Sequence, residues 1–311
     1  MTGGGPVAGR RFLVVGGTGA VGSLFVERLV DSGAEVGVVD LNVPAVTCWP
    51  GPSFLRGDVT AIDGAFAAAL AKADTVVLAV PEQVALDCVG ELCRRLGPDT
   101  LLVDTLTVKE PFSEAVRRLD PARQSVGLNP MFAPSLGFAG RPVAAVVNSV
   151  GQAAQELLDQ ISQWGGRIVR VSAAEHDRLA SVSQSLTHAA VIAFGLGAKE
   201  LGIDISALSP VAPPPHTTML ALTARIANGA PEVYWDIQRG NPHAAQARQA
   251  LAGGLRRIAD LVGSDDEAGF AAVQAELRAF LGGELQHYGD LCARLFSVPA
   301  TVAAAEHDVA A

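Results

Sequence analysis

Short apolar segments alternate with helical patterns along the first half of the chain. Four of these segments are rich in β-branched residues and bounded by turn or helix signals, at 11–16, 35–40, 75–80 and 100–104. Helical patterns follow or separate them, at 21–30, 60–72, 82–96 and 110–118. Further strands are predicted at 125–128, 142–147 and 167–171. Because strands that are apolar on both faces and separated by helices are typical of a covered parallel sheet, we expect an α/β, Rossmann-type domain.

The second half of the chain has a different pattern. After Val171 the strand signals stop, and helices are predicted at 173–200, 215–228, 242–262 and 266–294. The sequence therefore predicts two domains, an α/β domain over 1–171 and an all-helical domain over 172–311. The tail from about residue 299 is rich in Ala and Val without turn signals, so we expect it to be frayed.

Composition and charge narrow the class of protein. The 311 residues are 49% hydrophobic and 18% charged, which suits two domains with buried cores. A net charge of −9 argues against nucleic acid or an anionic membrane as a partner. No apolar run approaches the roughly 18 residues that a membrane span needs. The four cysteines form no CxxC pair and show no metal-ligand spacing, so we expect reduced thiols in a cytoplasmic protein without a metal site.

A glycine-rich turn follows the first predicted strand and opens the first predicted helix. In VVGGTGAVG, Gly17, Gly19 and Gly22 form the pattern G-x-G-x-x-G. In a dinucleotide site one glycine makes the tight turn, one lets the backbone approach the pyrophosphate, and one lets the helix pack on the strand. Because glycine-rich turns are common, an ordinary strand-to-helix turn is the alternative interpretation.

Asp40 ends the second predicted strand, 18 positions after Gly22. A carboxylate at this place can accept hydrogen bonds from the adenosine ribose hydroxyls and would repel a 2′-phosphate. The next residues, Leu41, Asn42 and Val43, supply no arginine to receive such a phosphate. We therefore expect NAD rather than NADP as the cofactor.

Five further segments carry specific patterns. They read LAVPEQV at 78–84, DTLTVKEP at 104–111, GLNPMFAP at 127–134, EHDRLASVSQSLTH at 175–188 and TARIANGAPEVYWDI at 223–237. Together and in this order, from Arg11 to about Phe296, they resemble the prephenate/arogenate dehydrogenase family. The resemblance implies a Rossmann domain followed by a helical domain that dimerises, and hence a homodimer.

The resemblance also implies a reaction, the NAD-dependent oxidative decarboxylation of a small dicarboxylate. Hydride leaves ring C4 for NAD while the C1 carboxylate departs as carbon dioxide. By the resemblance, Arg225 holds the ring carboxylate, and His188 lies near the substrate side chain with Gln184 one helical turn before it. The alternatives are a surface salt bridge for Arg225 and satisfied polar positions in a helical interface for the other two.

Five more residues match positions of the family less directly. His176 in EHD reads as a family residue, although a histidine flanked by acids at an exposed helix start would look the same. Thr107 and Lys109 follow a strand end, where cofactor-facing residues collect, and a solvated loop lysine is the alternative. His216 and Thr217 match positions that contact the substrate side chain, but the three prolines before them depart from the family.

The sequence departs from the family at three positions, and the family residues at two of them face the ring C4 substituent. Asn129 stands where the family has the histidine that accepts the proton of the ring 4-hydroxyl. Ala79 stands where the family has a serine that hydrogen-bonds the same hydroxyl, and Ala133 replaces a glycine. The residues that match the carboxylate and cofactor positions are retained.

A 4-amino group at C4 explains this pair of changes. The lone pair of a neutral amine can expel the hydride without prior loss of a proton, so an imidazole base is not needed. The Asn129 carbonyl can accept an N–H bond and carries no charge, and Ala79 gives room. The hypothesis is that a stand-alone enzyme converts 4-amino-4-deoxyprephenate to 4-aminophenylpyruvate in specialised aromatic amine biosynthesis. The alternatives are a prephenate or arogenate dehydrogenase of tyrosine biosynthesis and a non-catalytic NAD-binding sensor.

Overall fold

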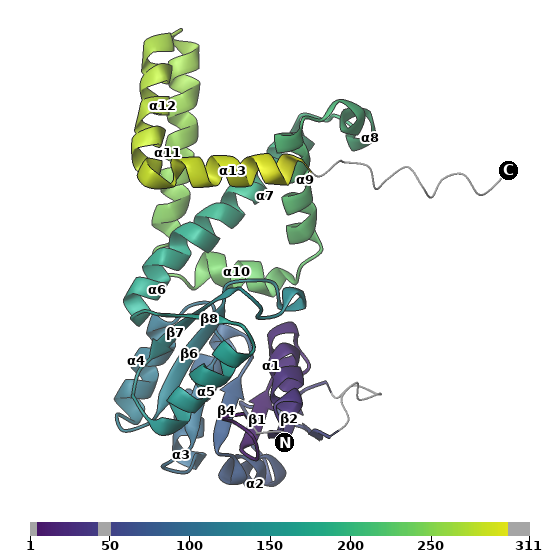
Figure 1. Ribbon diagram of the computed structural model, residues 1–311, viewed down its shortest axis with the longest axis vertical. Helices are drawn as coiled ribbons and strands as arrows, with labels where there is room; N and C mark the ends of the chain where they lie inside the picture. The colour runs from purple at the N-terminus through teal and green to yellow at the C-terminus, as the bar shows by residue number, and fades with distance from the viewer. Residues whose placement is uncertain (1–4, 43–50, 298–311) are drawn as a thin grey trace, which may run out of the picture. The chain divides into compact units, whose positions relative to one another are not determined.

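The computed structural model describes residues 5–42 and 51–297 (Figure 1). Contacts between Cα atoms divide the chain into two compact units. The sheet unit comprises Met1–Ser181 and Trp235–His243, and the helical unit comprises Val182–Tyr234 and Ala244–Ala311. The predicted domain boundary at 171/172 stays a prediction, and the predicted fraying of the tail lies outside the described residues.

The sheet unit is built on eight strands in the order β3-β2-β1-β4-β5-β6-β7-β8. Their bounds are β1 Arg11–Val15, β2 Glu35–Asp40, β3 Ser53–Arg56, β4 Thr75–Leu78, β5 Leu101–Asp104, β6 Ser125–Pro130, β7 Pro142–Val147 and β8 Arg167–Arg170. The predicted α/β fold is confirmed, and the seven predicted strands are all present. The sequence pattern did not predict β3, a four-residue edge strand that is exposed or half-buried along its length.

The last two strands correct the expectation of a purely parallel sheet. Strands β3 to β6 pair in parallel, but β7 runs antiparallel to β6, and β8 is parallel to β7. The segment between β6 and β7 contains one short 3-10 turn, η1 Pro134–Leu136, and no crossover helix. Because a parallel return needs a crossover of a dozen or more residues, the chain comes back antiparallel at this point.

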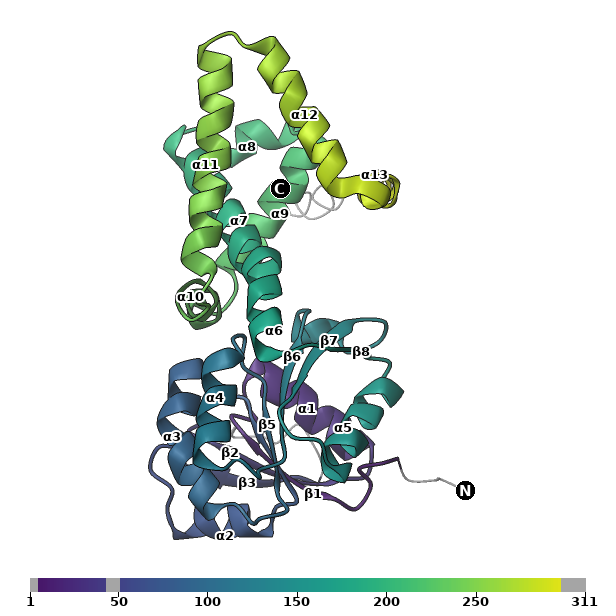
Figure 2. The same cartoon turned by 90° about the vertical axis from the view of Figure 1, so that its left-hand side faces the viewer.

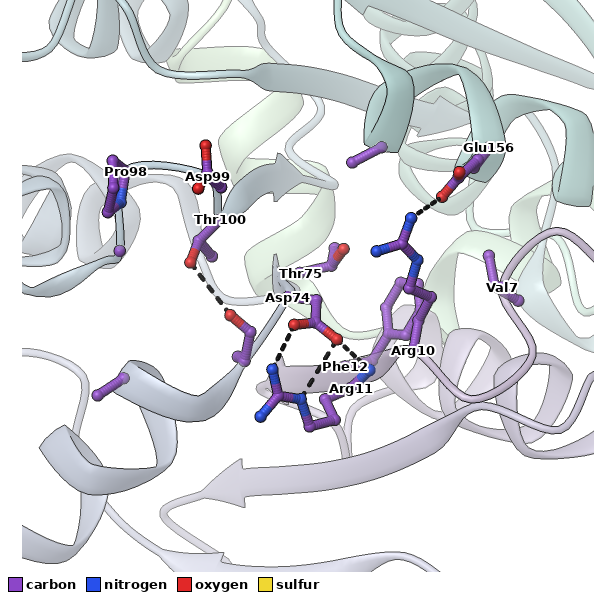
Figure 3. Close-up of a pocket in the computed structure, with 14 residues that line it drawn as sticks. Val7, Arg10, Arg11, Phe12, Asp74, Thr75, Pro98, Asp99, Thr100 and Glu156 are labelled. Atoms are coloured by element: carbon purple, nitrogen blue, oxygen red, sulfur yellow. Dashed lines mark hydrogen bonds and ion pairs between the residues drawn. The ribbon is translucent and has the colours of Figure 1, made fainter.

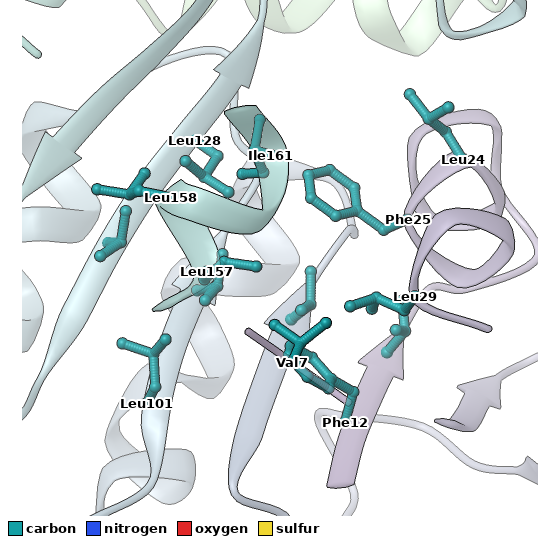
Figure 4. Close-up of a cluster of buried hydrophobic side chains, with 14 of the residues drawn as sticks. Val7, Phe12, Leu24, Phe25, Leu29, Leu101, Leu128, Leu157, Leu158 and Ile161 are labelled. Atoms are coloured by element: carbon teal, nitrogen blue, oxygen red, sulfur yellow. The ribbon is translucent and has the colours of Figure 1, made fainter. Parts of the chain in front are cut away.

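Helices cover both faces of the sheet (Figure 2). One face carries α1 Ala20–Asp31 and α5 Gln152–Gln163, and the other carries α2 Gly64–Lys72, α3 Glu82–Arg95 and α4 Glu110–Leu119. Helix α5 was not predicted from the sequence, whereas the other four helices were. Each face has its own apolar core, and on the first face Phe25 and Leu29 of α1 pack with Leu128 of β6 and with Leu157 and Ile161 of α5 (Figure 4). This packing fixes the strand ends that carry the candidate site.

One long irregular helix begins in the sheet unit and continues into the helical unit. It consists of α6 Ala173–Ala180, a π-helical segment at Ser181–Leu186, and α7 Thr187–Glu200. By length and composition it could cross a membrane, with a mean hydropathy of 1.3 over 18 of its 28 residues. The uninterrupted apolar runs within this helix are nonetheless much shorter than such a window. The window is apolar on average because Ser, Thr, Gln and His, rather than charged residues, interrupt its apolar positions.

The remaining helices follow the predicted pattern, apart from one predicted helix that is split and two helices that were not predicted. Their bounds are α8 Ile205–Leu208, α9 Pro214–Ala227, α10 Pro231–Arg239, α11 Ala244–Gly263, α12 Glu267–Leu281 and α13 Leu285–Phe296. The prediction of a single helix over 266–294 is wrong, because Gly282, with φ of +52°, ends α12 before α13 begins. The short helices α8 and α10 were not predicted.

Candidate active site

The glycine loop joins β1 to α1, and three of its glycines have no room for a side chain. Gly16 has φ of +78°, and its N–H donates to the Val39 carbonyl at 2.8 Å. A Cβ at Gly22 would clash with the Gly16 carbonyl oxygen and lie 2.7 Å from Gly17 Cα, which are backbone atoms. A Cβ at Gly17 would lie 2.7 Å from Val38 Cγ1. Gly16 was not singled out from the sequence, although its positive φ makes the turn.

Gly19 has a more open environment than the other loop glycines. It is the N-cap residue of α1, and the first turn of that helix contains no acidic residue. A Cβ at Gly19 would contact the Gly16 carbonyl oxygen at an ordinary 3.4 Å. Because Gly19 has no side chain, the space next to the N–H groups at the start of α1 is left open. This arrangement fits the pyrophosphate of a dinucleotide.

Asp40 lies at the end of β2, next to the glycine loop. Its Oδ2 accepts the N–H of Thr18 at 3.1 Å, and its Oδ1 accepts the N–H of Asn42 at 3.1 Å. Each carboxylate oxygen keeps a further lone pair that can accept a ribose hydroxyl. Of the three residues after Asp40 that were predicted to supply no arginine for a 2′-phosphate, Val43 lies outside the described residues. The carboxylate fits an adenosine ribose that carries no 2′-phosphate.

Ala79 and Asn129 both lie at the carboxyl edge of the sheet. Ala79 directly follows β4, and Asn129 is the next-to-last residue of β6. Leu78 pairs with Asp104 of β5, and Asp104 pairs with Gly127 of β6, so one strand separates the two positions. Their backbones are therefore roughly 10 Å apart. Because ligands of open α/β sheets bind beyond this edge, both departures from the family lie where a substrate ring can reach them.

Asn129 belongs to a buried chain of hydrogen-bonded side chains. Its Nδ2 lies 3.0 Å from His176 Nε2, and His176 Nδ1 lies 2.7 Å from Asp177 Oδ1. The Asp177 carboxylate also accepts the N–H groups of Lys109 at 2.8 Å and Glu110 at 2.9 Å, where α4 begins. The alternative of an exposed helix-start histidine is wrong, since His176 is only 3% exposed. These hydrogen bonds link β6, α6 and the start of α4.

The Lys109 side chain is fully buried in the sheet unit. Its Nζ lies 2.6 Å from Asp104 Oδ1 and donates to the Leu128 carbonyl at 2.9 Å. Burial lowers the pKa of Lys109, and the nearby Asp104 carboxylate opposes this shift. The alternative of a solvated loop lysine is therefore wrong. Contacts of Lys109 and the half-buried Thr107 with the cofactor stay predictions.

Glu82 places an unusual carboxyl group near the same edge of the sheet. It begins α3, its Oε2 is buried, and that atom has no hydrogen-bond partner among the residues that the structure describes. Burial, followed by the carboxylates of Asp236 and Asp177, raises the pKa of Glu82 to about 7. This group therefore changes its protonation near neutral pH. It lies within the LAVPEQV segment but was not singled out from the sequence.

The helical unit brings two predicted site residues together. His188 lies in α7 and Arg225 in the last turn of α9. Burial, followed by the positive charge of Arg225, lowers the pKa of His188. The His188 ring meets the edge of Tyr234 at a centroid distance of 5.2 Å, and its buried Nδ1 has no partner within the described part of the chain. A guanidinium beside an imidazole with an unpaired nitrogen can bind an anionic group.

The surface salt bridge considered for Arg225 is not found among residues 5–42 and 51–297. Gln184 lies in the π-helical segment, so a wider turn replaces the α-helical turn assumed between it and His188. His216 packs against Phe194 at a centroid distance of 5.5 Å, and Thr217 donates to the Pro213 carbonyl at 3.4 Å. Substrate contacts by these residues stay predictions.

The prolines before His216 have a local structural reason. Pro213 is the N-cap residue of α9, and proline also occupies the first turn of that helix. Backbone N–H groups have no intrahelical acceptor there, so proline loses nothing at these positions.

A cavity of about 250 Å³ lies at the opposite edge of the sheet, beside the amino ends of β1 and β4 (Figure 3). Its two arginines are paired with carboxylates, Arg10 with Glu156 at 2.7 Å and Arg11 with Asp74 at 2.6 Å. These cations are therefore not available to a dicarboxylate substrate. The candidate site at the carboxyl edge of the sheet is therefore distinct from this cavity.

Asp177 and Asn241, which belong to the hydrogen-bonded group around His176, were not singled out from the sequence. Asn241 Nδ2 donates to the Asp177 carbonyl at 2.7 Å, which ties the segment after α10 to the histidine-bearing helix. The acid next to His176 in EHD is a signal that could have identified Asp177. Nothing in the local pattern identifies Asn241, because its partner lies 64 positions away.

The glycine loop, the ribose-side carboxylate and the polar carboxyl edge define a class, a dinucleotide-binding α/β protein with a second, helical unit. A sequence model described as the prephenate dehydrogenase nucleotide-binding domain matches residues 57–152, and one described as the prephenate dehydrogenase dimerization domain matches 172–276. A model of the NAD dependent epimerase/dehydratase family matches residues 12–86. The chain belongs to the prephenate dehydrogenase family and is an oxidoreductase, as the sequence predicts.

Individual relatives agree with this assignment. The chain is 50% identical to 4-amino-4-deoxyprephenate dehydrogenase of Streptomyces pristinaespiralis, over 94% of this chain and 98% of the relative. It is 26% identical to a probable arogenate/prephenate dehydrogenase of Methanocaldococcus jannaschii, over 89% of this chain but only 63% of that protein.

Solved structures support the fold. Prephenate dehydrogenase from A. aeolicus, in complex with hydroxyphenyl propionate and NAD+, superimposes with a TM-score of 0.63 at 17% identity, covering 87% of this chain and 96% of that chain. A putative prephenate dehydrogenase of Corynebacterium glutamicum gives 0.66 at 17% identity, covering 88% of each chain. At these identities the likeness concerns the fold alone.

Proposed function

We propose that the enzyme converts 4-amino-4-deoxyprephenate and NAD to 4-aminophenylpyruvate, carbon dioxide and NADH. The observation that carries the proposal is Asn129, which stands on β6 where the family has a histidine base. The 50% identity to the 4-amino-4-deoxyprephenate dehydrogenase of S. pristinaespiralis supports the same substrate. The product fits a specialised aromatic amine pathway.

The amide of Asn129 suits an amine better than a hydroxyl. When hydride leaves a carbon that bears a hydroxyl, the oxygen becomes strongly acidic, and a base within reach accelerates the step. When the carbon bears a neutral amine, the nitrogen lone pair forms a C=N bond as the hydride leaves. Loss of the carboxylate as carbon dioxide then supplies the electron pair that makes the ring aromatic and restores the amine. The amide need only accept an N–H bond, which requires no charge.

The other proposed roles follow from the chemistry of the residues. Gly19 and the start of α1 hold the NAD pyrophosphate, and Asp40 holds the ribose. NAD, when bound, accepts the hydride from ring C4. Arg225 binds the ring carboxylate through its positive charge, and the N–H of the His188 imidazole donates to the side-chain end of the substrate.

The test is a substrate panel with purified enzyme and NAD, followed by NADH absorbance. We expect kcat/KM for 4-amino-4-deoxyprephenate to exceed that for prephenate and arogenate by at least about tenfold, since a buried polar group discriminates between hydrogen-bonding partners. Equal or better turnover of prephenate or arogenate would overturn the proposal. NAD binding without oxidation of any of the three substrates would favour the sensor alternative.

Reversal of the two departures tests the role of the C4 residues. Asn129→His and Ala79→Ser, alone and together, should raise activity on prephenate, because they restore the base and the hydroxyl. Ala133→Gly, which restores the third departure, is the matched control and should not. No gain from the double variant would contradict the assignment of these residues to C4.

We also propose that the enzyme is a cytoplasmic homodimer joined through its helical domain. The match of residues 172–276 to a dimerization domain supports this assembly, as do exposed apolar side chains such as Leu255, Val262 and Leu277 in α11 and α12. Light scattering after size-exclusion chromatography should give twice the chain mass of 32.0 kDa. A monomeric mass at micromolar concentration would exclude a stable dimer.

A further inference from the structure

The amide of Asn129 can turn either its carbonyl oxygen or its NH2 group toward a substrate, and a buried neighbour decides between them. We propose that His176, held by Asp177, is a positioning residue that keeps the Asn129 carbonyl oxygen facing the C4 substituent and thereby sets substrate selectivity. This inference rests on the proposed function, because it assumes that Asn129 contacts the C4 group. The proposed reaction itself gives no role to His176 or Asp177.

The direction of the hydrogen bonds follows from the chemistry of the three side chains. An ionised carboxylate is an acceptor, so the 2.7 Å contact between Asp177 Oδ1 and His176 Nδ1 places the ring hydrogen on Nδ1. In the neutral ring Nε2 then carries a lone pair and accepts a hydrogen bond. The Asn129 amide has hydrogens on Nδ2, which lies 3.0 Å from that lone pair. The NH2 group is therefore turned toward His176, and Oδ1 is turned away from it.

Asp177 is itself held as an acceptor. Its two oxygens receive the N–H groups of Lys109 and Glu110, neither of which can reverse direction. These N–H groups open α4, where the positive end of the helix dipole favours a carboxylate. The backbone of Asp177 is anchored by Asn241 through the 2.7 Å bond to its carbonyl. The backbone donors thus fix the Asp177 carboxylate as an acceptor. Asp177 in turn fixes the tautomer of His176, and His176 orients the Asn129 amide.

The orientation matters because the two faces of the amide act oppositely on an amine. A carbonyl oxygen accepts an N–H bond from the C4 amino group and leaves its nitrogen lone pair available to expel the hydride. An NH2 group in the same place would donate to that lone pair and withdraw the electrons that the reaction uses. A hydroxyl offers two lone pairs and tolerates a donor better. Loss of the orientation should therefore slow the amine more than the hydroxyl substrate.

Two variants of His176 separate positioning from packing. His176→Leu removes the acceptor, and we expect kcat for 4-amino-4-deoxyprephenate, relative to prephenate, to fall about tenfold, the size of one lost hydrogen bond to a buried group. His176→Gln keeps an acceptor near the place of Nε2 and should retain the ratio to within about threefold. His287→Leu, at an exposed position of α13, is the matched control and should leave the ratio unchanged. The dissociation constant of NAD should not move in any of them.

The background of Asn129→Leu shows whether His176 acts through the amide. There the addition of His176→Leu should not change the ratio of the two substrates further. An equal loss on both substrates, or the same change of ratio in both backgrounds, would overturn the proposal and indicate a structural role. Failure of the proposed function is distinguishable, because it would appear as a wild-type preference for prephenate.

The tautomer can also be measured in the wild-type protein without substrate. Long-range 15N–1H correlation spectra should show His176 protonated at Nδ1 and unprotonated at Nε2. This measurement keeps the proposal falsifiable if His176→Leu does not fold. A ring protonated at Nε2 would require the opposite orientation of the amide and would refute the inference.

Discussion

The buried ion pair of Lys109 and Asp104 makes a quantitative prediction about the stability of the sheet unit. The ammonium lies 2.6 Å from Asp104 Oδ1 and donates to the Leu128 carbonyl, and neither side chain is more than 3% exposed. In Lys109→Met the volume is nearly kept, but the carboxylate loses its cation, and its remaining donor is the Leu106 N–H at 3.3 Å. Removal of one partner of a buried pair costs about 3–5 kcal/mol, and we expect this loss of unfolding free energy.

The assay is urea unfolding followed by circular dichroism and by tryptophan fluorescence, to which Trp164 and Trp235 of the sheet unit contribute. Adding Asp104→Asn removes the stranded charge, so the double variant should recover at least about half of the loss. Lys72→Met, at an exposed position of α2, is the control and should change the free energy by less than about 0.5 kcal/mol.

Two outcomes would refute this reasoning. A loss of unfolding free energy below about 1 kcal/mol in Lys109→Met would mean that the buried Asp104 carboxylate does not depend on the Lys109 ammonium. A double variant as unstable as the single one would mean that packing, not the stranded carboxylate, causes the loss. If Lys109 instead served the cofactor, Lys109→Met would weaken NAD binding while leaving the unfolding free energy unchanged.

Three further predictions concern the glycines and Glu82. Gly19→Ala should change the unfolding free energy by less than about 1 kcal/mol, because its Cβ has room, yet weaken NAD binding at least about tenfold in a fluorescence titration, whereas Gly22→Ala should lose both. Unchanged NAD binding in Gly19→Ala would contradict the pyrophosphate site. Gly127→Ala would place a Cβ 2.9 Å from both Asp104 Oδ2 and Lys109 Cδ and should cost about 1–3 kcal/mol in urea unfolding. Because burial and neighbouring carboxylates raise the pKa of Glu82 to about 7, the stability tied to its neutral form is present at low pH and lost as the pH rises through that value. Glu82→Gln should therefore be nearly neutral near pH 5 and stabilise by about 1 kcal/mol at pH 8, after allowance for solvent screening of this partly exposed group. A stability difference independent of pH would show that the carboxyl has an ordinary pKa.

Much of the fold follows from local patterns. Most of the predicted strands are largely buried and read as short apolar runs, as in β4 and β5. The predicted strand β8 is more exposed, but its Ile168 and Val169 are β-branched. The strand that was missed, β3, is as short and as exposed as β8, but its sequence SFLR contains no β-branched residue and so carries a weaker strand signal. The direction of β7 depends on the absence of a crossover helix after β6. The break at Gly282 depends on a positive φ that the helical periodicity around it does not encode.

The cofactor half of the site was also predictable, because its parts lie close together in sequence and occupy fixed places relative to β1, α1 and β2. In the structure Gly17 and Gly22 have no room for a Cβ, and Asp40 accepts a hydrogen bond from the glycine loop, as a dinucleotide loop requires. The departures at Ala79 and Asn129 could be recognised against the family pattern. Their placement at one edge of the sheet follows from the strand order, which periodicity alone does not give.

The sequence by itself determined the order of elements, the class of cofactor and the family, since these depend on residue type, spacing and motif. Only the tertiary structure decided the state of the polar residues. It buried Lys109 against Asp104 and brought Asp177 and Asn241 together with His176 and Asn129. Hydrogen bonds between residues some 47 to 68 positions apart are set by how strands and helices pack, and burial decides which charges must be paired. Long-range packing, which no local pattern records, therefore turned an asparagine at the end of β6 into an oriented amide.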